Sequence, residues 1–97
     1  MDEIVNTDIN DLEKNNIKEL FELCIAEIKN ATHMSNDDKL YLYKYYKQAT
    51  IGDINIPQPS WYDFVGKEKY KAWKSVEDTS KDISMKRYIE KVQSFFK

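Results

Sequence analysis

Two tyrosines and a lysine near the middle of the chain have the types and spacing of a site for phosphate and a flat ring. Tyr43, Tyr46 and Lys47 share one face if residues 36–51 are helical, because a helix has about 3.6 residues per turn. Tyr43 and Lys47 are then one turn apart, so a phenol and an ammonium can both donate to one phosphate. Tyr46 can stack on a nucleobase. Any one tyrosine could equally pack in a core with its hydroxyl at the edge, but the pairing of Tyr43 with Lys47 favours a ligand.

A second lysine-rich segment follows a long linker. Lys69 and Trp73 are one helical turn apart, next to the apolar side of the segment. The stem of Lys69 can cover a hydrocarbon chain while its ammonium pairs with phosphate. Lys67, Lys71 and Lys74 form a separate stripe, which is more typical of a solvated face. Together the two segments suit a ligand that is part phosphate, part ring and part hydrocarbon.

The charge distribution favours a small anionic ligand over bulk nucleic acid. The net charge of the 97-residue chain is −2, yet residues 1–38 carry a balance of −7 and residues 39–97 a balance of +5. A domain that binds nucleic acid is usually strongly basic throughout, so no nucleic-acid partner is expected. An apolar content of 41% and a charged content of 33% indicate one soluble globular domain.

Other chemistries find little support in the residues. The single cysteine, Cys24, excludes an internal disulfide and lies on an apolar helix face, which predicts a buried thiol. His33 has no metal-ligand spacing around it, so no metal site and no cofactor are expected. The acidic start of the chain lacks the apolar region of a signal peptide, and no apolar run approaches the roughly 18 residues of a membrane span. We therefore expect a cytoplasmic protein without stable membrane insertion.

Hydrophobic periodicity predicts an all-α domain. The expected helices cover residues 17–30, 36–51, 66–76 and 80–96. Ser35 provides a cap for the second helix and Gly52 a stop. Thr79 or Ser80 is expected to cap the fourth. Residues 1–16 are polar and are expected to form a tail, with a short helical turn around residues 9–12, and residues 17–97 form the domain.

Several motifs together resemble the acyl-CoA-binding protein family. They are Tyr46-Lys47-Gln48-Ala49-Thr50, Gly52-Asp53, Asn55, Lys67-x-Lys69, Ala72-Trp73, Thr79-Ser80-Lys81 and Met85-Lys86-x-Tyr88-Ile89. The resemblance covers roughly residues 20–97 and contains no low-complexity sequence. It implies an up-down-down-up four-helix bundle, with a long loop between the second and third helices.

The resemblance also implies roles for individual side chains. The positions of Tyr43 and Lys47 contact the phosphate on the ribose of CoA in the family, and the position of Tyr46 packs on the adenine. Lys69 matches a lysine that contacts the ligand, and Tyr88 matches a position at the nucleotide end. The candidate ligand-binding set is completed by Lys29, matching a lysine near the phosphates, and by Leu40. Trp73 matches a structural tryptophan, and Tyr70 stands where a second tryptophan is usual.

Some positions depart from the family pattern. Val65 replaces a frequent lysine and Lys39 a frequent methionine, and the link after the first helix is one residue shorter, which affects the register of Lys29. These departures bear on the shape of the acyl groove and on its preferred chain length, and leave the nucleotide positions intact.

The resemblance implies a non-enzymatic, monomeric carrier for medium- to long-chain acyl-CoA. The acyl chain would lie near the end of the bundle where the first two helices meet. A protein-interaction module of the same fold and a weak binder of single-stranded RNA remain as alternatives.

Overall fold

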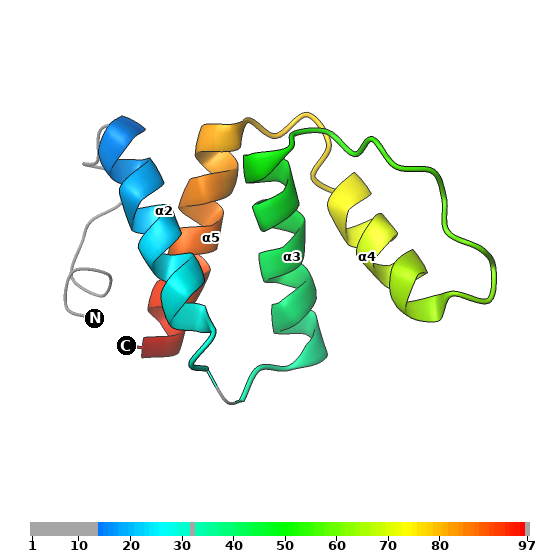
Figure 1. Ribbon diagram of the computed structural model, residues 1–97, viewed down its shortest axis with the longest axis horizontal. Helices are drawn as coiled ribbons and strands as arrows, with labels where there is room; N and C mark the ends of the chain where they lie inside the picture. Colours follow the sequence, from blue (N-terminus) through cyan, green and yellow to red (C-terminus); the bar gives the residue numbers. More distant parts are fainter. Residues whose placement is uncertain (1–13, 32, 97) are drawn as a thin grey trace.

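The computed structural model describes residues 14–31 and 33–96 of the chain. Four helices lie within these residues: α2 (Lys14–Ile28), α3 (Asn36–Thr50), α4 (Phe64–Lys74) and α5 (Lys81–Phe96) (Figure 1). No strand occurs in these described ranges, so the predicted all-α class is confirmed. The predicted turn around residues 9–12 lies outside the described residues. No helix of the described part is long and apolar enough to cross a bilayer.

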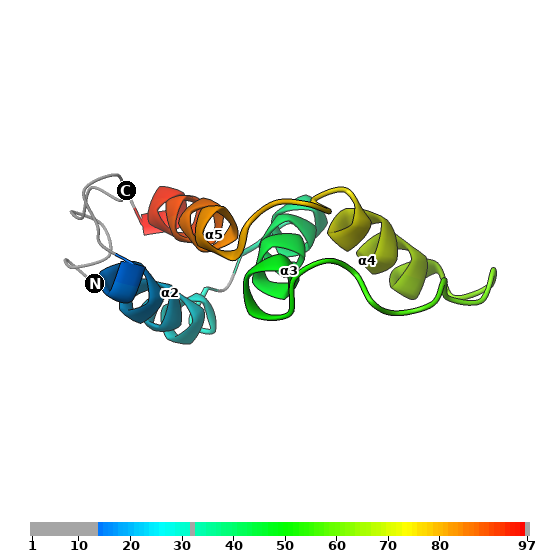
Figure 2. The same cartoon turned by 90° about the horizontal axis from the view of Figure 1, so that it is seen from above.

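The helices follow the predicted up-down-down-up order. In Figure 1, α2 and α5 run in one direction, whereas α3 and α4 run in the other. α5 packs against both α2 and α3, and α4 packs against α3. Figure 2 shows α4 on the outer side of α3, away from α2. The segment between α3 and α4 follows the outer edge of the molecule and returns to the start of α4, which allows these consecutive helices to be parallel neighbours.

The core lies where α2, α3 and α5 meet. Its buried members are Ile17, Leu20, Phe21, Cys24, Leu42, Ala49, Tyr88, Ile89 and Val92. In α2 and α5 they recur at three- and four-residue spacing, and in α3 they are seven residues, or about two turns, apart, so each of these helices turns one apolar stripe inwards. Trp73 on α4 is 1% exposed, which confirms its predicted place in the interior.

Helix ends are set by short-range hydrogen bonds. The Ser35 hydroxyl accepts from the Asp38 N–H at 3.0 Å and begins α3 where predicted. Gly52 has a φ of 106°, a conformation that glycine adopts most easily, and the helix ends before it. The Asp63 carboxylate accepts from the Gly66 N–H at 2.9 Å, so α4 begins two residues before the predicted start. Ser80 is the residue that caps α5, because its hydroxyl accepts from the Ile83 N–H at 3.1 Å.

A polar network fixes the loop that leaves α3. The buried Gln48 amide donates to Asp53 Oδ1 at 2.8 Å and to the Thr79 carbonyl at 2.9 Å. Asp53 Oδ1 also accepts from the Asp78 N–H at 2.8 Å. The indole Nε1 of Trp73 donates to the Gly52 carbonyl at 2.9 Å. These bonds tie α3, α4 and the link before α5 together at one end of the molecule.

Candidate functional site

The predicted phosphate-binding side chains meet at one tyrosine. The ammonium of Lys47, on α3, lies 5.9 Å from the centroid of the Tyr43 ring. The ammonium of Lys69, on α4, lies 5.4 Å from the same centroid. α3 and α4 are packed parallel neighbours, so lysines far apart in sequence approach the same ring. The arrangement concentrates two positive charges next to a phenol that can donate a hydrogen bond.

The Tyr43 hydroxyl remains protonated at neutral pH. Partial burial of the side chain raises its pKa above 10.0, the usual value for tyrosine. A neutral phenol donates to an anionic oxygen and adds no negative charge to the pair of ammonium groups. Tyr43 and the two lysines can therefore act together on one anionic group.

A groove of about 290 Å³ opens next to this cluster, between the C-terminal end of α2 and the N-terminal half of α3. Its lining consists of Ile25, Ile28, Lys29, Met34, Lys39, Leu42, Tyr43, Tyr46 and Tyr88. Most of these side chains are apolar or aromatic. Tyr43 belongs both to the groove and to the lysine cluster, so an apolar surface and a cationic one meet at this residue.

Two of the groove-lining rings, those of Tyr46 and Tyr88, pack against each other and against Phe21 of the core. The rings of Tyr46 and Tyr88 are 6.5 Å apart, and Phe21 lies 6.3 Å from Tyr46 and 5.1 Å from Tyr88. Tyr46 is 38% exposed and offers a ring face to a ligand, whereas Tyr88 is only 4% exposed. Burial, with smaller effects from Cys24 and Tyr46, raises the pKa of Tyr88 to about 12. Its hydroxyl is therefore neutral at every physiological pH.

The structure brings most of the predicted site residues into one region. The groove is lined by four of them, Lys29, Tyr43, Tyr46 and Tyr88. The ammonium groups of Lys47 and Lys69 lie within 6 Å of the centroid of the Tyr43 ring. Leu40 is half-buried on α3 and is not among the groove-lining side chains. The ligand contacts of all seven residues stay predictions.

Sequence reasoning left some groove residues out of the candidate set. Ile25 and Ile28 lie on α2, and Met34 lies in the link after it. The available signal was that this apolar face continues to the last turn of α2 and is followed by a methionine in the link. Lys39, expected to alter the groove because it replaces a frequent methionine, does line the groove.

Cys24 and His33 offer no second reactive centre. Cys24 is fully buried, as predicted, and burial raises its pKa to about 12, so the reactive thiolate is absent at neutral pH. Within residues 14–31 and 33–96, no group of three or more His, Cys, Asp or Glu side chains is placed to hold a metal ion.

Comparison with known proteins identifies the family. The sequence matches the family described as Acyl CoA binding protein over residues 18–92. The chain belongs to the acyl-CoA-binding protein family. This family match includes all seven candidate residues and all four helices except the first residues of α2 and the last turn of α5.

Curated relatives in the acyl-CoA-binding protein family are longer than this chain. Acyl-CoA-binding domain-containing protein 6 of Rattus norvegicus is 41% identical over 78 residues, which are 79% of this chain and 28% of the relative. The homologue from Dictyostelium discoideum is 39% identical over 82 residues, or 80% of this chain and 28% of that protein. The chain thus spans little more than a quarter of the length of these relatives.

Solved acyl-CoA-binding proteins share the fold. The crystal structure of ACBP from Moniliophthora perniciosa is 43% identical, with a TM-score of 0.72 over 76% of this chain and 74% of that one. Acyl-CoA-binding protein 2 from Oryza sativa is 38% identical, with a TM-score of 0.78 over 82% of this chain and 90% of that one.

Proposed function

We propose that this protein binds medium- to long-chain fatty acyl-CoA esters and carries them without changing them chemically. The main support is the position of Tyr43, because its ring lies within 6 Å of two ammonium groups and also lines an apolar groove. An acyl-CoA ester has the matching chemistry, with several phosphates next to a long hydrocarbon chain. Membership of the acyl-CoA-binding protein family supports this choice of ligand.

The CoA phosphates would be held by the lysine cluster. Lys47 and Lys69 supply charge from two helices, and Tyr43 supplies a neutral donor between them. Hydrogen bonds in which one partner is ionised are about twice as strong as neutral ones. Lys29, which follows α2 and lines the groove, is the further cation we assign to the phosphates.

The acyl chain would occupy the apolar part of the groove. Ile25, Ile28 and Met34 come from the end of α2 and the link after it, and Leu42 comes from α3. Burying a methylene group away from water stabilises a complex by about 0.8 kcal/mol, so a chain of several methylenes would contribute substantially to binding.

The adenine would pack on Tyr46, whose ring is partly exposed. Tyr88 lies behind it in the groove wall and supports the Tyr46 ring from α5. We place Leu40 at the edge of the ligand. The carrier would buffer and deliver acyl-CoA as a cytoplasmic monomer, and it would do so without catalytic groups, cofactor or metal.

Isothermal titration with a long-chain acyl-CoA, with free CoA and with a single-stranded oligonucleotide tests the proposal. We expect tight binding of the ester, much weaker binding of CoA and none of the oligonucleotide. Binding of the oligonucleotide alone would support the RNA-binding alternative. Failure of a folded protein to bind any of the three would leave the protein-interaction module as the better explanation.

A further inference from the structure

A second group of exposed apolar side chains lies in the loop just before α4 and in the first turn of that helix. Trp61, Tyr62, Phe64 and Val65 are 77%, 66%, 72% and 65% exposed. The rings of Trp61 and Tyr62 pack against each other, with centroids 5.6 Å apart and planes at 85°. Exposed apolar side chains are common singly, but four within five consecutive residues form a contiguous patch. We call residues 61–65 the aromatic tip.

The aromatic tip lies at one extremity of the molecule. Figures 1 and 2 both place the loop before α4, and the beginning of α4, at the end farthest from α2 and α5. The candidate acyl-CoA groove is lined by α2, α3 and α5, so this patch is a separate surface. A flat partner can approach it without contact with the rest of the bundle.

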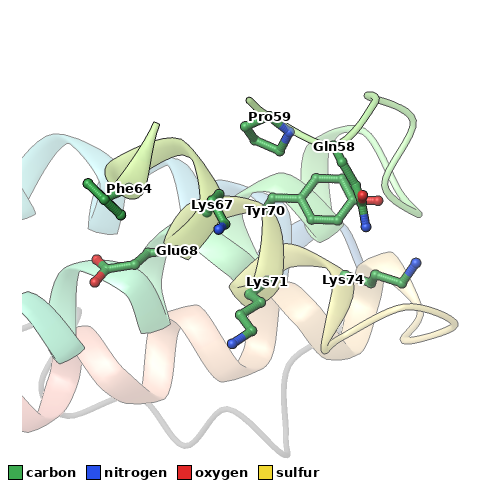
Figure 3. Close-up of a pocket in the computed structure, with 8 residues that line it drawn as sticks. All are labelled: Gln58, Pro59, Phe64, Lys67, Glu68, Tyr70, Lys71 and Lys74. Carbon is green, nitrogen blue, oxygen red and sulfur yellow. The ribbon is translucent and has the colours of Figure 1, made fainter. Parts of the chain in front are cut away.

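Behind the tip, a pocket of about 470 Å³ follows the outer face of α4 (Figure 3). Phe64, Tyr70 and Pro59 provide apolar walls, and Lys67 and Lys71 are two of its three lysines. The third is Lys74, whose ammonium lies 5.8 Å from the Tyr70 ring centroid. The pocket therefore joins the aromatic tip to a row of positive charges.

Acidic side chains near this row have other partners. The Glu68 carboxylate, which also lines the pocket, accepts from the Asn36 side chain of α3 at 3.3 Å. Asp63 accepts from the Gly66 N–H as the cap of α4. Among the described residues, Lys67 and Lys71 form no salt bridge. Both carboxylates are exposed and keep their charge, because their donors are neutral. The three lysines outnumber them, so the net charge beside the aromatic tip is positive.

We propose that the aromatic tip and the lysines at positions 67, 71 and 74 form a docking surface for an anionic lipid bilayer. Tryptophan and tyrosine favour the boundary between water and hydrocarbon, because their rings are apolar and carry one polar group. Basic side chains near an anionic leaflet are attracted to its headgroups. The order along the chain, apolar tip first and lysine row second, lets the tip enter the interface while the lysines remain at headgroup level.

Docking of this kind is weak and reversible. Four apolar side chains bury far less surface than a spanning helix, and stable anchoring generally needs two independent signals. The surface is suited to brief contact with membranes, where amphiphilic ligands also partition. The inference concerns a surface apart from the acyl-CoA groove and does not depend on the proposed function.

Sedimentation with vesicles tests the docking surface. The protein is mixed with vesicles of phosphatidylcholine alone or with about 30% phosphatidylserine, the anionic lipid of cytoplasmic leaflets. We expect binding to the anionic vesicles and little to the neutral ones. The double variant Trp61→Ala, Phe64→Ala and the triple variant Lys67→Gln, Lys71→Gln, Lys74→Gln should each lower the partition coefficient at least tenfold.

Matched variants on other helices provide the controls. Leu23→Ala with Ile83→Ala removes two exposed apolar side chains from α2 and α5. Lys18→Gln, Lys81→Gln, Lys86→Gln removes three charges away from α4. Both should bind anionic vesicles within about twofold of the wild type, since neither alters the aromatic tip or its lysine row. Circular dichroism establishes that every variant is folded.

Fluorescence gives a second measurement. Trp73 is buried, so a blue shift of the emission on addition of anionic vesicles would report Trp61, and Trp61→Phe should abolish it. Equal binding by the site variants and the controls would overturn the proposal, as would absence of binding to either vesicle. A dimer that forms through Trp61 and Phe64 in sedimentation equilibrium would also overturn it. Titration of acyl-CoA without vesicles separates the two proposals, because the site variants should bind the ester as the wild type does.

Discussion

The Lys47 ammonium lies 5.6 Å from the centroid of the buried Trp73 ring. The same ammonium lies 5.9 Å from the ring of Tyr43, which lines the groove. One lysine therefore stands between a core tryptophan on α4 and a candidate ligand-binding tyrosine on α3. The stem of Lys47 contributes to the packing of α3 on α4, while its charge is available to a ligand.

Removal of the Lys47 charge should weaken acyl-CoA binding and spare the fold. Lys47→Met keeps an unbranched stem against Trp73 and deletes the ammonium. Because a hydrogen bond to a charged group contributes about 1.5–3 kcal/mol, titration should show a loss of that size in binding free energy. Lys44→Met is the control on the same helix, since its ammonium lies over the rings of Tyr41 and Tyr45 instead. Equal affinities of the two folded variants would refute the role of Lys47.

Substitution of Trp73 should lower stability, whereas substitution of Tyr43 should lower ligand affinity. Trp73→Ala removes a fully buried ring and its bond to the Gly52 carbonyl, so unfolding by denaturant should show a loss of about 3–5 kcal/mol. Tyr43→Phe removes one hydroxyl from a half-buried ring and should lower ligand affinity while the melting temperature stays near that of the wild type. A Trp73→Ala protein of normal stability that binds poorly would show that the core and the site were assigned the wrong way round.

The side-chain amide of Gln48 should contribute to the stability of the fold. Gln48→Met fills a similar volume but leaves the Thr79 carbonyl without its donor and Asp53 with one donor fewer. Loss of the part-buried bond to the Thr79 carbonyl should lower the free energy of unfolding by about 1 kcal/mol, as measured by chemical denaturation. Removal of Gln48 Oε1, which is buried and has no hydrogen-bond partner among the described residues, offsets part of this loss. Gln58→Met, in the exposed loop, is the control. Unchanged stability would mean that the network around Asp53 does not hold the loop in place.

Asp53 should make stability depend on acid pH. Hydrogen bonds from the Asp78 N–H and from Gln48 lower its pKa below the usual 3.8. The folded state then binds fewer protons than the unfolded state, so the contribution of Asp53 is present above about pH 4 and is lost as the pH falls through the folded pKa. Asp53→Asn should therefore be less stable than the wild type at pH 6, and the difference should shrink towards pH 3.

Thermal unfolding of both proteins across this pH range measures the effect. Glu22→Gln, which removes an exposed carboxylate on α2, controls for the loss of one charge. A difference between wild type and Asp53→Asn that stays constant from pH 6 to pH 3 would contradict the assignment.

The sequence predicted the helices by their apolar faces and predicted both ends of α3 and the cap of α5, but not the starts of α2 and α4. α3 begins at its predicted residue because Ser35 is a strong cap that a sequence displays directly. α2 begins at Lys14, three residues before the predicted start, because its first residues are polar and carry no periodic signal. α4 begins early because the Asp63 cap bonds to a glycine three residues away, a pattern that the prolines before it obscured.

The candidate site could likewise be predicted only in part from the sequence. Tyr43 and Lys47 could be paired from helical spacing alone, since both lie on α3. Their meeting with Lys69 depends on how α4 packs on α3, which periodicity does not determine and which the family resemblance only implied. The network of Gln48, Asp53, Asp78 and Thr79 joins residues up to 31 positions apart and was not predicted, although the QAT-x-GD motif contains two of its members.

Affinity for acyl-CoA should rise with chain length and respond to salt only in its head group. Each buried methylene should add up to about 0.8 kcal/mol until the groove between α2 and α3 is full. Contacts of Lys47 and Lys69 with phosphate are exposed ion contacts and are weakened by added salt, whereas hydrocarbon burial is not. Titration of esters from short to long at two ionic strengths would therefore give two plots of binding free energy against chain length. The two plots should have equal slopes and differ by a constant amount. If free CoA bound as tightly as a long-chain ester, the groove would have no role in binding. A slope that changed with salt would show instead that binding of the chain and binding of the phosphates are coupled. That result would contradict an apolar groove and a lysine cluster that act separately on either side of Tyr43.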